Sequence, residues 1–223
     1  RQRQMCIRDR YTIMQIDADS QMLYIHIPRT GGSWFSYAWS SHKNIGKINY
    51  RAGLLRNNVN NTRVKAGRHG RLSGVLNQLQ VLEFNYHNYK IITTIRHPID
   101  RVLSSWSWFS DVKETAQKAG WKGIHDMLDE FEAGKIRVNY MPQVFWLKEE
   151  GAKWDHIFRF EDLLIGPQKV TNIFPLFTPE TRLRRQGRTR GYKHYLTNDE
   201  IDRIKILYKD DIEYLKPYYP DLK

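Results

Sequence analysis

The chain has 223 residues, enough for one α/β domain with a sizeable core and too few to favour two. Its formal net charge of +12 favours acidic partners, such as nucleotide phosphates, acidic glycans or nucleic acid, over the simpler purpose of solubility. No apolar run of about 18 residues predicts a membrane span, and the single cysteine, Cys6, excludes an intrachain disulfide and a cysteine metal cluster.

The first ten residues show neither helical nor strand periodicity, and we interpret residues 1–10 as a non-native leader. The leader carries four arginines and one aspartate, so its removal lowers the net charge only from +12 to +9. We expect residues 11–223 to form a single domain.

Short apolar runs rich in β-branched residues predict three buried strands, at residues 22–27, 90–95 and 155–160. Apolar residues at helical spacing and local capping signals predict the helices. These cover residues 34–41, 72–84, 99–109, 122–132, 140–148 and 197–215, with one more beginning at 161. Strands that alternate with helices indicate an α/β fold with a central, mainly parallel sheet flanked by helices.

The first strand runs into the turn Pro28-Arg29-Thr30-Gly31-Gly32-Ser33 and then a helix. In such a P-loop-like arrangement, glycines let backbone N–H groups approach an anion, and the helix N-terminus adds partial positive charge. The sequence G-x-x-x-x-G-K-[ST] is absent, so this is not a Walker loop. A Gly-Gly turn alone is also compatible with a purely structural role.

The second strand runs into Arg96-His97-Pro98, followed by Arg101 and Ser104 on the next predicted helix. Arg96 therefore stands at the carboxyl end of a strand, where α/β sheets bind ligands. Taken alone, this arginine and serine are equally compatible with ordinary local hydrogen bonds.

Together the two loops resemble those of the PAPS-dependent sulfotransferases, where PAPS is 3′-phosphoadenosine 5′-phosphosulfate. P-R-T-G-G-S resembles the 5′-phosphosulfate loop, usually P-K-T-G-G-[ST], and R-x-P-x-x-R-x-x-S-x-W resembles the 3′-phosphate loop. The likeness extends over most of residues 22–219 and is strongest to carbohydrate-type, Golgi-like enzymes and their bacterial and viral relatives. The compartment would be the cytoplasm for a bacterial or viral enzyme and the Golgi lumen for a truncated eukaryotic one.

The resemblance implies a set of donor-binding residues in this chain. The first loop would hold the 5′-phosphosulfate, with Arg29 in place of the family's lysine at the bridging oxygen, and Arg96 and Ser104 would hold the 3′-phosphate. A basic loop at 181–193 would close over the nucleotide, although the motif leaves open which basic residue makes the contact. The candidate contacts are Arg29, Thr30, Gly31, Gly32, Ser33, Trp34, Arg96, Ser104, Arg188, Tyr192 and Lys193.

Transfer to a hydroxyl needs a base, and an imidazole near neutral pKa suits this role. His69 lies in the stretch where related enzymes carry such a histidine; the alternatives are that it is a plain loop histidine, or that Glu161 is the base. Arg29 would stabilise the leaving phosphate electrostatically. His26 is expected to belong to the first buried strand, and His97 either to contact the nucleotide or to cap a helix.

The predicted function is therefore sulfuryl transfer from PAPS to a hydroxyl acceptor, a glycan or other anionic carbohydrate, with adenosine 3′,5′-bisphosphate leaving. We expect no metal and no nucleic-acid partner. One alternative is a P-loop-type kinase, disfavoured because the Walker lysine is absent. The other is a non-catalytic protein that binds polyanions.

Overall fold

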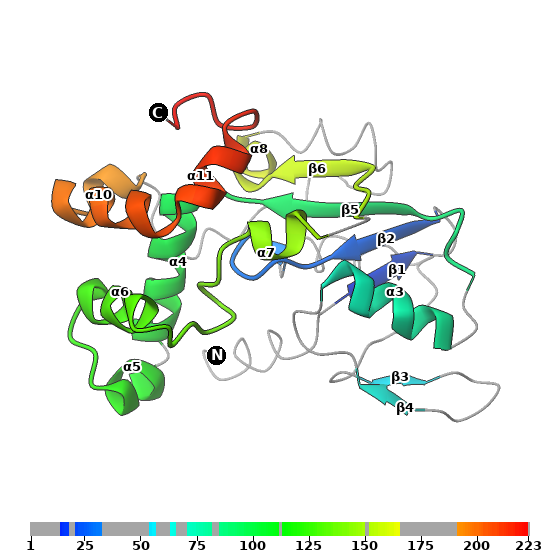
Figure 1. Ribbon diagram of the computed structural model, residues 1–223, viewed down its shortest axis with the longest axis horizontal. Helices are drawn as coiled ribbons and strands as arrows, with labels where there is room; N and C mark the ends of the chain where they lie inside the picture. Colours follow the sequence, from blue (N-terminus) through cyan, green and yellow to red (C-terminus); the bar gives the residue numbers. More distant parts are fainter. Residues whose placement is uncertain are drawn as a thin grey trace. The chain divides into compact units, whose positions relative to one another are not determined.

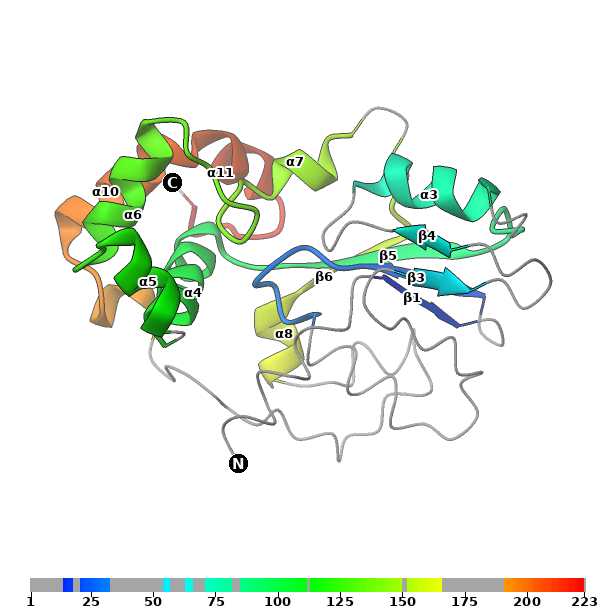
Figure 2. The same cartoon turned by 90° about the horizontal axis from the view of Figure 1, so that it is seen from below.

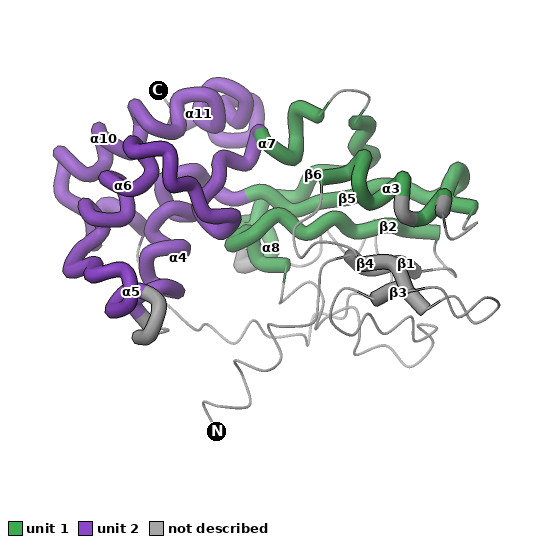
Figure 3. The backbone as a smooth tube through the Cα atoms, turned by 60° about the horizontal axis from the view of Figure 1, so that its bottom comes forward, with its two compact units in different colours: residues 1–95, 145–183 green, residues 96–144, 184–223 purple. Residues whose placement is uncertain are grey.

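The computed structural model is shown in Figure 1. It describes residues 14–17, 21–32, 54–56, 63–65, 71–81, 85–111, 113–149, 152–165 and 191–222. The chain divides into two compact units, each assembled from two separate stretches of sequence (Figure 3). Unit 1 comprises residues 1–95 and 145–183, and unit 2 comprises residues 96–144 and 184–223. The expected leader at 1–10 lies outside the described residues and stays a prediction.

Unit 1 is built on a four-stranded sheet in the order β1-β2-β5-β6. Its strands are β1 (Met14–Asp17), β2 (Met22–Ile25), β5 (Lys90–Ile95) and β6 (His156–Arg159). β2, β5 and β6 run parallel, with Ile25 opposite Thr93 and Ile95 opposite Arg159, which confirms the expected parallel sheet. β1 pairs antiparallel with β2.

Helices cover this sheet on both sides. Figure 2 shows α3 (Leu72–Val81) and α8 (Phe160–Ile165) on opposite faces. On the α3 side, Leu72, Val75 and Leu79 pack against Leu23 and Ile25 of β2. Because the strands are enclosed from both sides, β2 and β5 are nearly continuous apolar runs and show no alternating pattern. A separate antiparallel pair, β3 (Leu54–Arg56) and β4 (Arg63–Lys65), lies within the polar stretch before α3.

Unit 2 is helical and has an aromatic core. Among the buried residues, the Phe109 ring meets Trp121 edge-on at 5.4 Å and Tyr140 at 5.9 Å. The helices of this unit are α4 (Pro98–Asp111), α5 (Lys113–Ala119), α6 (Ile124–Glu132), η1 (Tyr192–His194), α10 (Asn198–Leu207) and α11 (Lys209–Leu215). α7 (Val144–Leu147) begins where the chain passes back to unit 1.

Several boundaries differ from the sequence prediction. The single helix expected at 197–215 is wrong: the chain breaks at Tyr208 into α10 and α11. Tyr208 is buried, its ring packs on Phe131 at 5.0 Å, and its hydroxyl donates to the Tyr140 carbonyl, so tertiary contacts override helix propensity there. The helix expected at 140–148 is only the four-residue α7. β1 and α5 were not predicted, and the helix expected at 34–41 lies outside the described residues.

Candidate functional site

The turn after β2 carries the first predicted phosphate loop, and its backbone is unusual. Arg29 has φ +67° and Gly31 has φ +92°, both in the left-handed region. Glycine adopts this region freely, whereas a residue with a Cβ is strained there. Backbone turns that contain left-handed residues can aim successive N–H groups at an anion. The Arg29 side chain is half-buried.

A chain of buried hydroxyls anchors this turn to the sheet. Thr30 Oγ1 donates to the Ile27 carbonyl at 2.8 Å and lies 2.9 Å from Thr94 Oγ1, which is 2.7 Å from the Tyr24 hydroxyl. Burial raises the pKa of the Tyr24 phenol far above its usual value, so this hydroxyl stays protonated and able to donate. Because the Thr30 hydroxyl is already hydrogen-bonded inside the core, the predicted contact of Thr30 with the nucleotide ligand would be made by its backbone.

Both glycines of the turn lie too close to a ring to accept a side chain. A Cβ on Gly31 would overlap the Phe160 ring at the start of α8, and a Cβ on Gly32 would overlap the imidazole of His26. His26 itself directly follows β2 and is half-buried. Packing therefore excludes a side chain at both glycines, and at Gly31 the left-handed φ also favours glycine. A bare backbone at both positions fits a ligand that approaches the main chain closely.

Arg96, in unit 2, directly follows β5 and is half-buried. The side-chain amide of Gln143 holds its main chain: Arg96 N–H donates to Gln143 Oε1 at 3.0 Å, and Gln143 Nε2 donates to the Arg96 carbonyl at 2.9 Å. Arg101, on the first turn of α4, is fully buried and donates through Nη1 to the Met141 carbonyl at 2.7 Å. Arg101 is thus a structural residue of unit 2.

Ser104 lies on α4, and Tyr192 of η1 contacts the start of the same helix. Ser104 lies half-buried on α4, four residues after Asp100, and residues at this spacing share a helix face. The Tyr192 N–H donates to Asp100 Oδ1 at 3.0 Å, and its ring stacks on His97 at 5.0 Å and 17°. Burial, and then the negative charges of Asp221 and Asp100, raise the pKa of the Tyr192 phenol. Arg96, Ser104 and Tyr192 thus occupy one region of unit 2.

His97 is buried in an aromatic box at the start of α4, where its carbonyl accepts from the Arg101 N–H at 2.9 Å, as expected of a residue that caps this helix. Besides the Tyr192 stack, its ring meets Tyr219 edge-on at 5.4 Å, and its Nε2 lies 3.6 Å from Asp221 Oδ2. His97 directly follows Arg96, and its imidazole therefore holds the Tyr192 ring near the start of α4.

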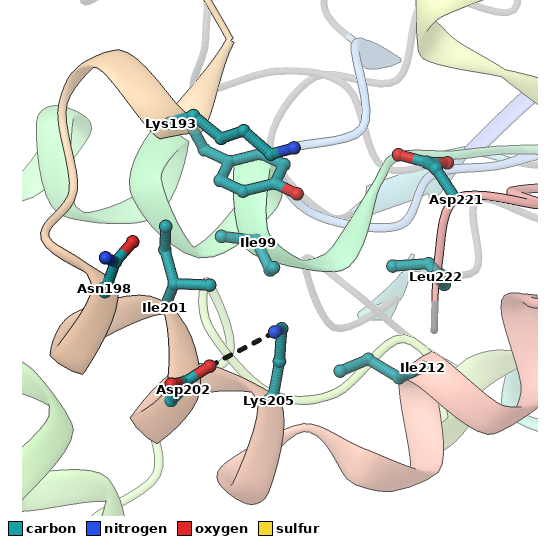
Figure 4. A pocket seen from close by; sticks show the side chains of 10 residues that line it. Ile99, Lys193, Asn198, Ile201, Asp202, Lys205, Ile212, Asp221 and Leu222 are labelled. Atoms are coloured by element: carbon teal, nitrogen blue, oxygen red, sulfur yellow. Dashed lines mark hydrogen bonds and ion pairs between the residues drawn. The ribbon is translucent and has the colours of Figure 1, made fainter.

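A shallow cavity of about 320 Å³ lies beside this region within unit 2. Its lining combines apolar side chains, such as Ile99 and Ile201, with Lys193, Asn198 and the ion pair between Lys205 and Asp202 (3.1 Å) (Figure 4). Tyr192 and Lys193, two of the predicted donor contacts, line it. Lys193 is exposed.

Four predicted site residues, Ser33, Trp34, His69 and Arg188, lie outside the described residues, so their roles stay predictions. Glu161, the alternative base, lies on the first turn of α8, where Arg159 pairs with Asp162 at 2.8 Å. Across the described part of the chain, no three His, Cys, Asp or Glu side chains group closely enough to hold a metal ion. Nor does any described helix combine the length and apolar character needed to cross a membrane.

A profile of the sulfotransferase family matches residues 13–219, which is most of the chain. The protein therefore belongs to the sulfotransferase family, whose members are PAPS-dependent transferases that pass sulfate to an acceptor. The α/β fold, with its three parallel strands flanked by helices, agrees with the P-loop-like fold of this family. No curated protein and no solved structure shows a significant match.

Sequence reasoning did not foresee the residues that support the site, above all Gln143, Asp211 and the Tyr24–Thr94 pair. For Asp211 a signal exists in the sequence: it shares a helical face with the apolar residues Tyr208, Ile212 and Leu215. An acidic residue on such a face is seldom buried unless it is paired. Gln143 and Thr94 carry no comparable signal, because their partners are distant in the chain.

Proposed function

We propose that this protein transfers the sulfuryl group of PAPS to a hydroxyl group of an anionic carbohydrate and releases adenosine 3′,5′-bisphosphate. The observation that carries the proposal is the turn after β2. Its two glycines leave room for no side chain, and Arg29, two residues before Gly31, has a left-handed backbone conformation. A turn of this kind suits a phosphosulfate group that contacts the main chain and one cation.

The donor contacts follow from the two loops. Arg29, Thr30, Gly31, Gly32, Ser33 and Trp34 are assigned to the 5′-phosphosulfate. Arg96 and Ser104 are assigned to the 3′-phosphate, with further nucleotide contacts from Arg188, Tyr192 and Lys193. Support for the second group comes from the shared region of unit 2 in which Arg96, Ser104 and Tyr192 lie.

In the proposed step, the acceptor oxygen attacks the sulfur of the donor as His69 takes the hydroxyl proton. The bond between sulfur and the bridging oxygen breaks, and its electron pair leaves with the 5′-phosphate. Arg29 and the backbone N–H groups of Gly31 and Gly32 stabilise the negative charge that grows on that oxygen. The step uses no metal ion, so EDTA should leave the rate of transfer unchanged.

The choice of a carbohydrate acceptor rests on the resemblance to carbohydrate-type enzymes and on the excess of positive charge. A net charge of +12, or +9 without the first ten residues, attracts a polyanion and disfavours a cationic acceptor. Binding of nucleic acid would also account for the positive charge, but it would not account for the two loops that resemble PAPS-binding loops.

Transfer of labelled sulfate from PAPS to a panel of acceptors tests the proposal. The panel contains an acidic glycosaminoglycan with its sulfates partly removed, a neutral oligosaccharide, a tyrosine peptide and a small phenol. We expect label on the acidic glycan. Label on the peptide or phenol alone would retain the sulfotransferase and reject the carbohydrate acceptor.

Thermal denaturation with nucleotides tests the donor assignment. Adenosine 3′,5′-bisphosphate at about 100 times its Kd should stabilise the fold by about 2.7 kcal/mol. ATP with magnesium should stabilise the fold less because it lacks the 3′-phosphate. Stronger stabilisation by ATP with magnesium would favour a kinase.

A further inference from the structure

The side chain of Gln143 is a two-armed clamp on the main chain of Arg96. It accepts from the Arg96 N–H at 3.0 Å and donates to the Arg96 carbonyl at 2.9 Å, so the oxygen and the nitrogen of the amide each bond the same residue. The side chain also has a hydrogen bond to Asp211. Gln143 is completely buried, with 0% of its surface exposed. Both bonds have good length for an amide pair.

The position of this clamp explains why an amide side chain is suited to it. The pairing of β5 with β6 runs to Ile95, opposite Arg159, and Arg96 is the residue that directly follows the strand. A buried peptide group needs a hydrogen-bond donor and an acceptor. A primary amide supplies both, and no other neutral side chain has the same arrangement as a peptide group. The Gln143 side chain therefore pairs with Arg96 as a peptide group would and fixes the peptide groups that flank the Arg96 Cα.

Gln143 is itself held by a buried acid. The two carboxylate oxygens of Asp211 accept from the N–H groups of Gln143 and Val144, each at 2.8 Å. Asp211 is fully buried on α11, and Arg101, also fully buried, secures the same segment through the Met141 carbonyl. Burial disfavours the charged form of Asp211 and raises its pKa, while the Arg101 cation and the two N–H groups act in the opposite direction. The segment 141–144, which carries Gln143, is therefore held in place by both Asp211 and Arg101.

We propose that Gln143 is a positioning residue for the 3′-phosphate site: it fixes the main chain of Arg96 so that the guanidinium is presented to the phosphate. This inference rests on the proposed donor assignment of Arg96. Gln143 does not touch the phosphate in this proposal, and Asp211 supports Gln143 in turn. The alternative is that the clamp stabilises unit 2 and has no influence on ligand affinity.

Calorimetric affinities for two nucleotides separate these alternatives. Adenosine 3′,5′-bisphosphate carries the 3′-phosphate and adenosine 5′-phosphate lacks it. Gln143→Met keeps the volume of the side chain but removes both bonds to Arg96. We expect it to weaken the affinity for the bisphosphate by about tenfold or more, by analogy with the loss seen when residues that support metal ligands are removed. The affinity for adenosine 5′-phosphate should change by less than about twofold. Gln143→Glu keeps the acceptor for the Arg96 N–H, but when ionised it cannot donate to the Arg96 carbonyl and it stands near the buried Asp211 carboxylate, so its affinity for the bisphosphate should lie below that of the wild type.

Two controls exclude a general loss of stability. The Thr197 hydroxyl accepts from the Glu200 N–H at 3.2 Å and forms the N-cap of α10. Thr197→Ala removes this cap and should destabilise unit 2 at a position away from Arg96. It should leave the affinity for both nucleotides unchanged. In an Arg96→Ala background, Gln143→Met should cause no further loss of bisphosphate affinity, because a residue that acts only through Arg96 has nothing left to position.

The outcomes are distinct. If the wild-type chain binds the bisphosphate and Gln143→Met and Gln143→Glu bind it equally well, the positioning role is overturned and the proposed function stands. The positioning role is also overturned if Gln143→Met weakens the affinity for both nucleotides equally. It is overturned as well if Gln143→Met causes the same loss of bisphosphate affinity in the Arg96→Ala background as in the wild type. If the wild-type chain shows no preference for the bisphosphate over adenosine 5′-phosphate, the donor assignment falls and this inference falls with it. If Gln143→Met does not fold, Gln143→Glu alone decides by the same comparison.

Discussion

At the scale of single residues, the turn after β2 combines a backbone that favours glycine with a residue that is not glycine. Arg29 adopts φ +67°, which costs a residue with a Cβ about 1–2 kcal/mol. A glycine at this position would avoid that cost but would remove the guanidinium. Strained residues persist where the surrounding structure holds them, and they cluster at functional sites. The buried hydroxyls of Tyr24, Thr94 and Thr30 supply such a hold.

The first prediction separates the contribution of the Arg29 side chain to the rate from the effect of its left-handed backbone on stability. Arg29→Ala should lower single-turnover sulfate transfer on the order of 100-fold at saturating donor, because charge on the bridging oxygen grows in the transition state. Arg29→Lys should keep much of the rate because it restores the usual residue of the family. Arg29→Gly relieves the backbone and should be more stable to heat than Arg29→Ala, yet equally slow. Wild-type turnover with weakened donor binding in Arg29→Ala would reduce Arg29 to a phosphate clamp.

The second prediction concerns the glycines. Gly31→Ala places a Cβ at φ +92° against the Phe160 ring and should lower the free energy of unfolding by about 1–3 kcal/mol, together with donor affinity. Gly74→Ala on α3 is the matched control, because a Cβ there would meet no atom within 4 Å apart from its chain neighbours and the backbone of its own helix. A helical alanine should stabilise the fold by about 0.5–1 kcal/mol. Denaturant unfolding measures both, and a Gly31→Ala chain as stable as wild type would contradict the described turn.

At the scale of elements, much of the fold could be predicted because local pattern and tertiary environment agree. The sequence predicts β5 at 90–95 with the same bounds as the structure, since KIITTI is both β-branched and buried. It also predicts the capping box at Thr197 and Glu200, a purely local device. The break at Tyr208 was missed because it contains neither glycine nor proline and depends on Tyr140 and Phe131, which lie far away in the chain.

The same reasoning applies to the candidate site. Motifs are enough to propose Arg29 and Arg96 as site residues, because each directly follows a predicted strand run and lies in a short local pattern. The residues that hold these two segments in place could not be predicted. Gln143 reaches Arg96 across 47 positions of sequence, and Thr94 reaches Thr30 across 64. Such pairs depend on how the chain is folded, which a local pattern does not encode.

The third prediction concerns the start of α6. The Asp126 carboxylate accepts from the N–H groups of Gly123 at 2.9 Å and Lys122 at 2.5 Å, and these bonds lower its pKa. A pKa lowered in the folded state contributes stability that is complete above the unfolded value of about 3.9 and is lost as pH falls through the folded value. Asp126→Asn should therefore lower the melting temperature at pH 7.

The gap between Asp126→Asn and wild type should close as the pH falls below the lowered pKa, when the wild-type carboxyl also becomes neutral. Asp202→Asn is the control: it breaks an exposed ion pair with Lys205, and such pairs contribute little. Melting curves of the three proteins between pH 7 and about pH 2 test the prediction. A gap that stays constant over this range would show that the carboxylate does not stabilise the helix start by its charge.

At the scale of the whole molecule, the two units are interleaved along the chain. Unit 2 takes α4 and α6 from its first stretch and α10 and α11 from its second, and the core residues Ile204 and Tyr208 come from the second stretch. Asp211 on α11, in turn, holds Gln143 in the first. Unit 2 is therefore incomplete without the C-terminal stretch, although its predicted phosphate contacts Arg96 and Ser104 lie in the first.

The last prediction concerns the net charge, a property of the whole chain. At +12, or +9 without residues 1–10, the protein should attract a polyanionic acceptor before any specific contact forms. Salt screens such attraction, since the Debye length falls from about 30 Å at 0.01 M to about 10 Å at 0.1 M. With saturating PAPS and an acidic glycan, kcat/KM should fall steeply between these ionic strengths while kcat changes little, because screening weakens encounter and leaves the chemical step alone. A neutral oligosaccharide from the same series is the control and should show a nearly flat kcat/KM. Equal salt dependence for both acceptors would place the effect on the donor or on the fold, and would separate the positive charge from acceptor choice.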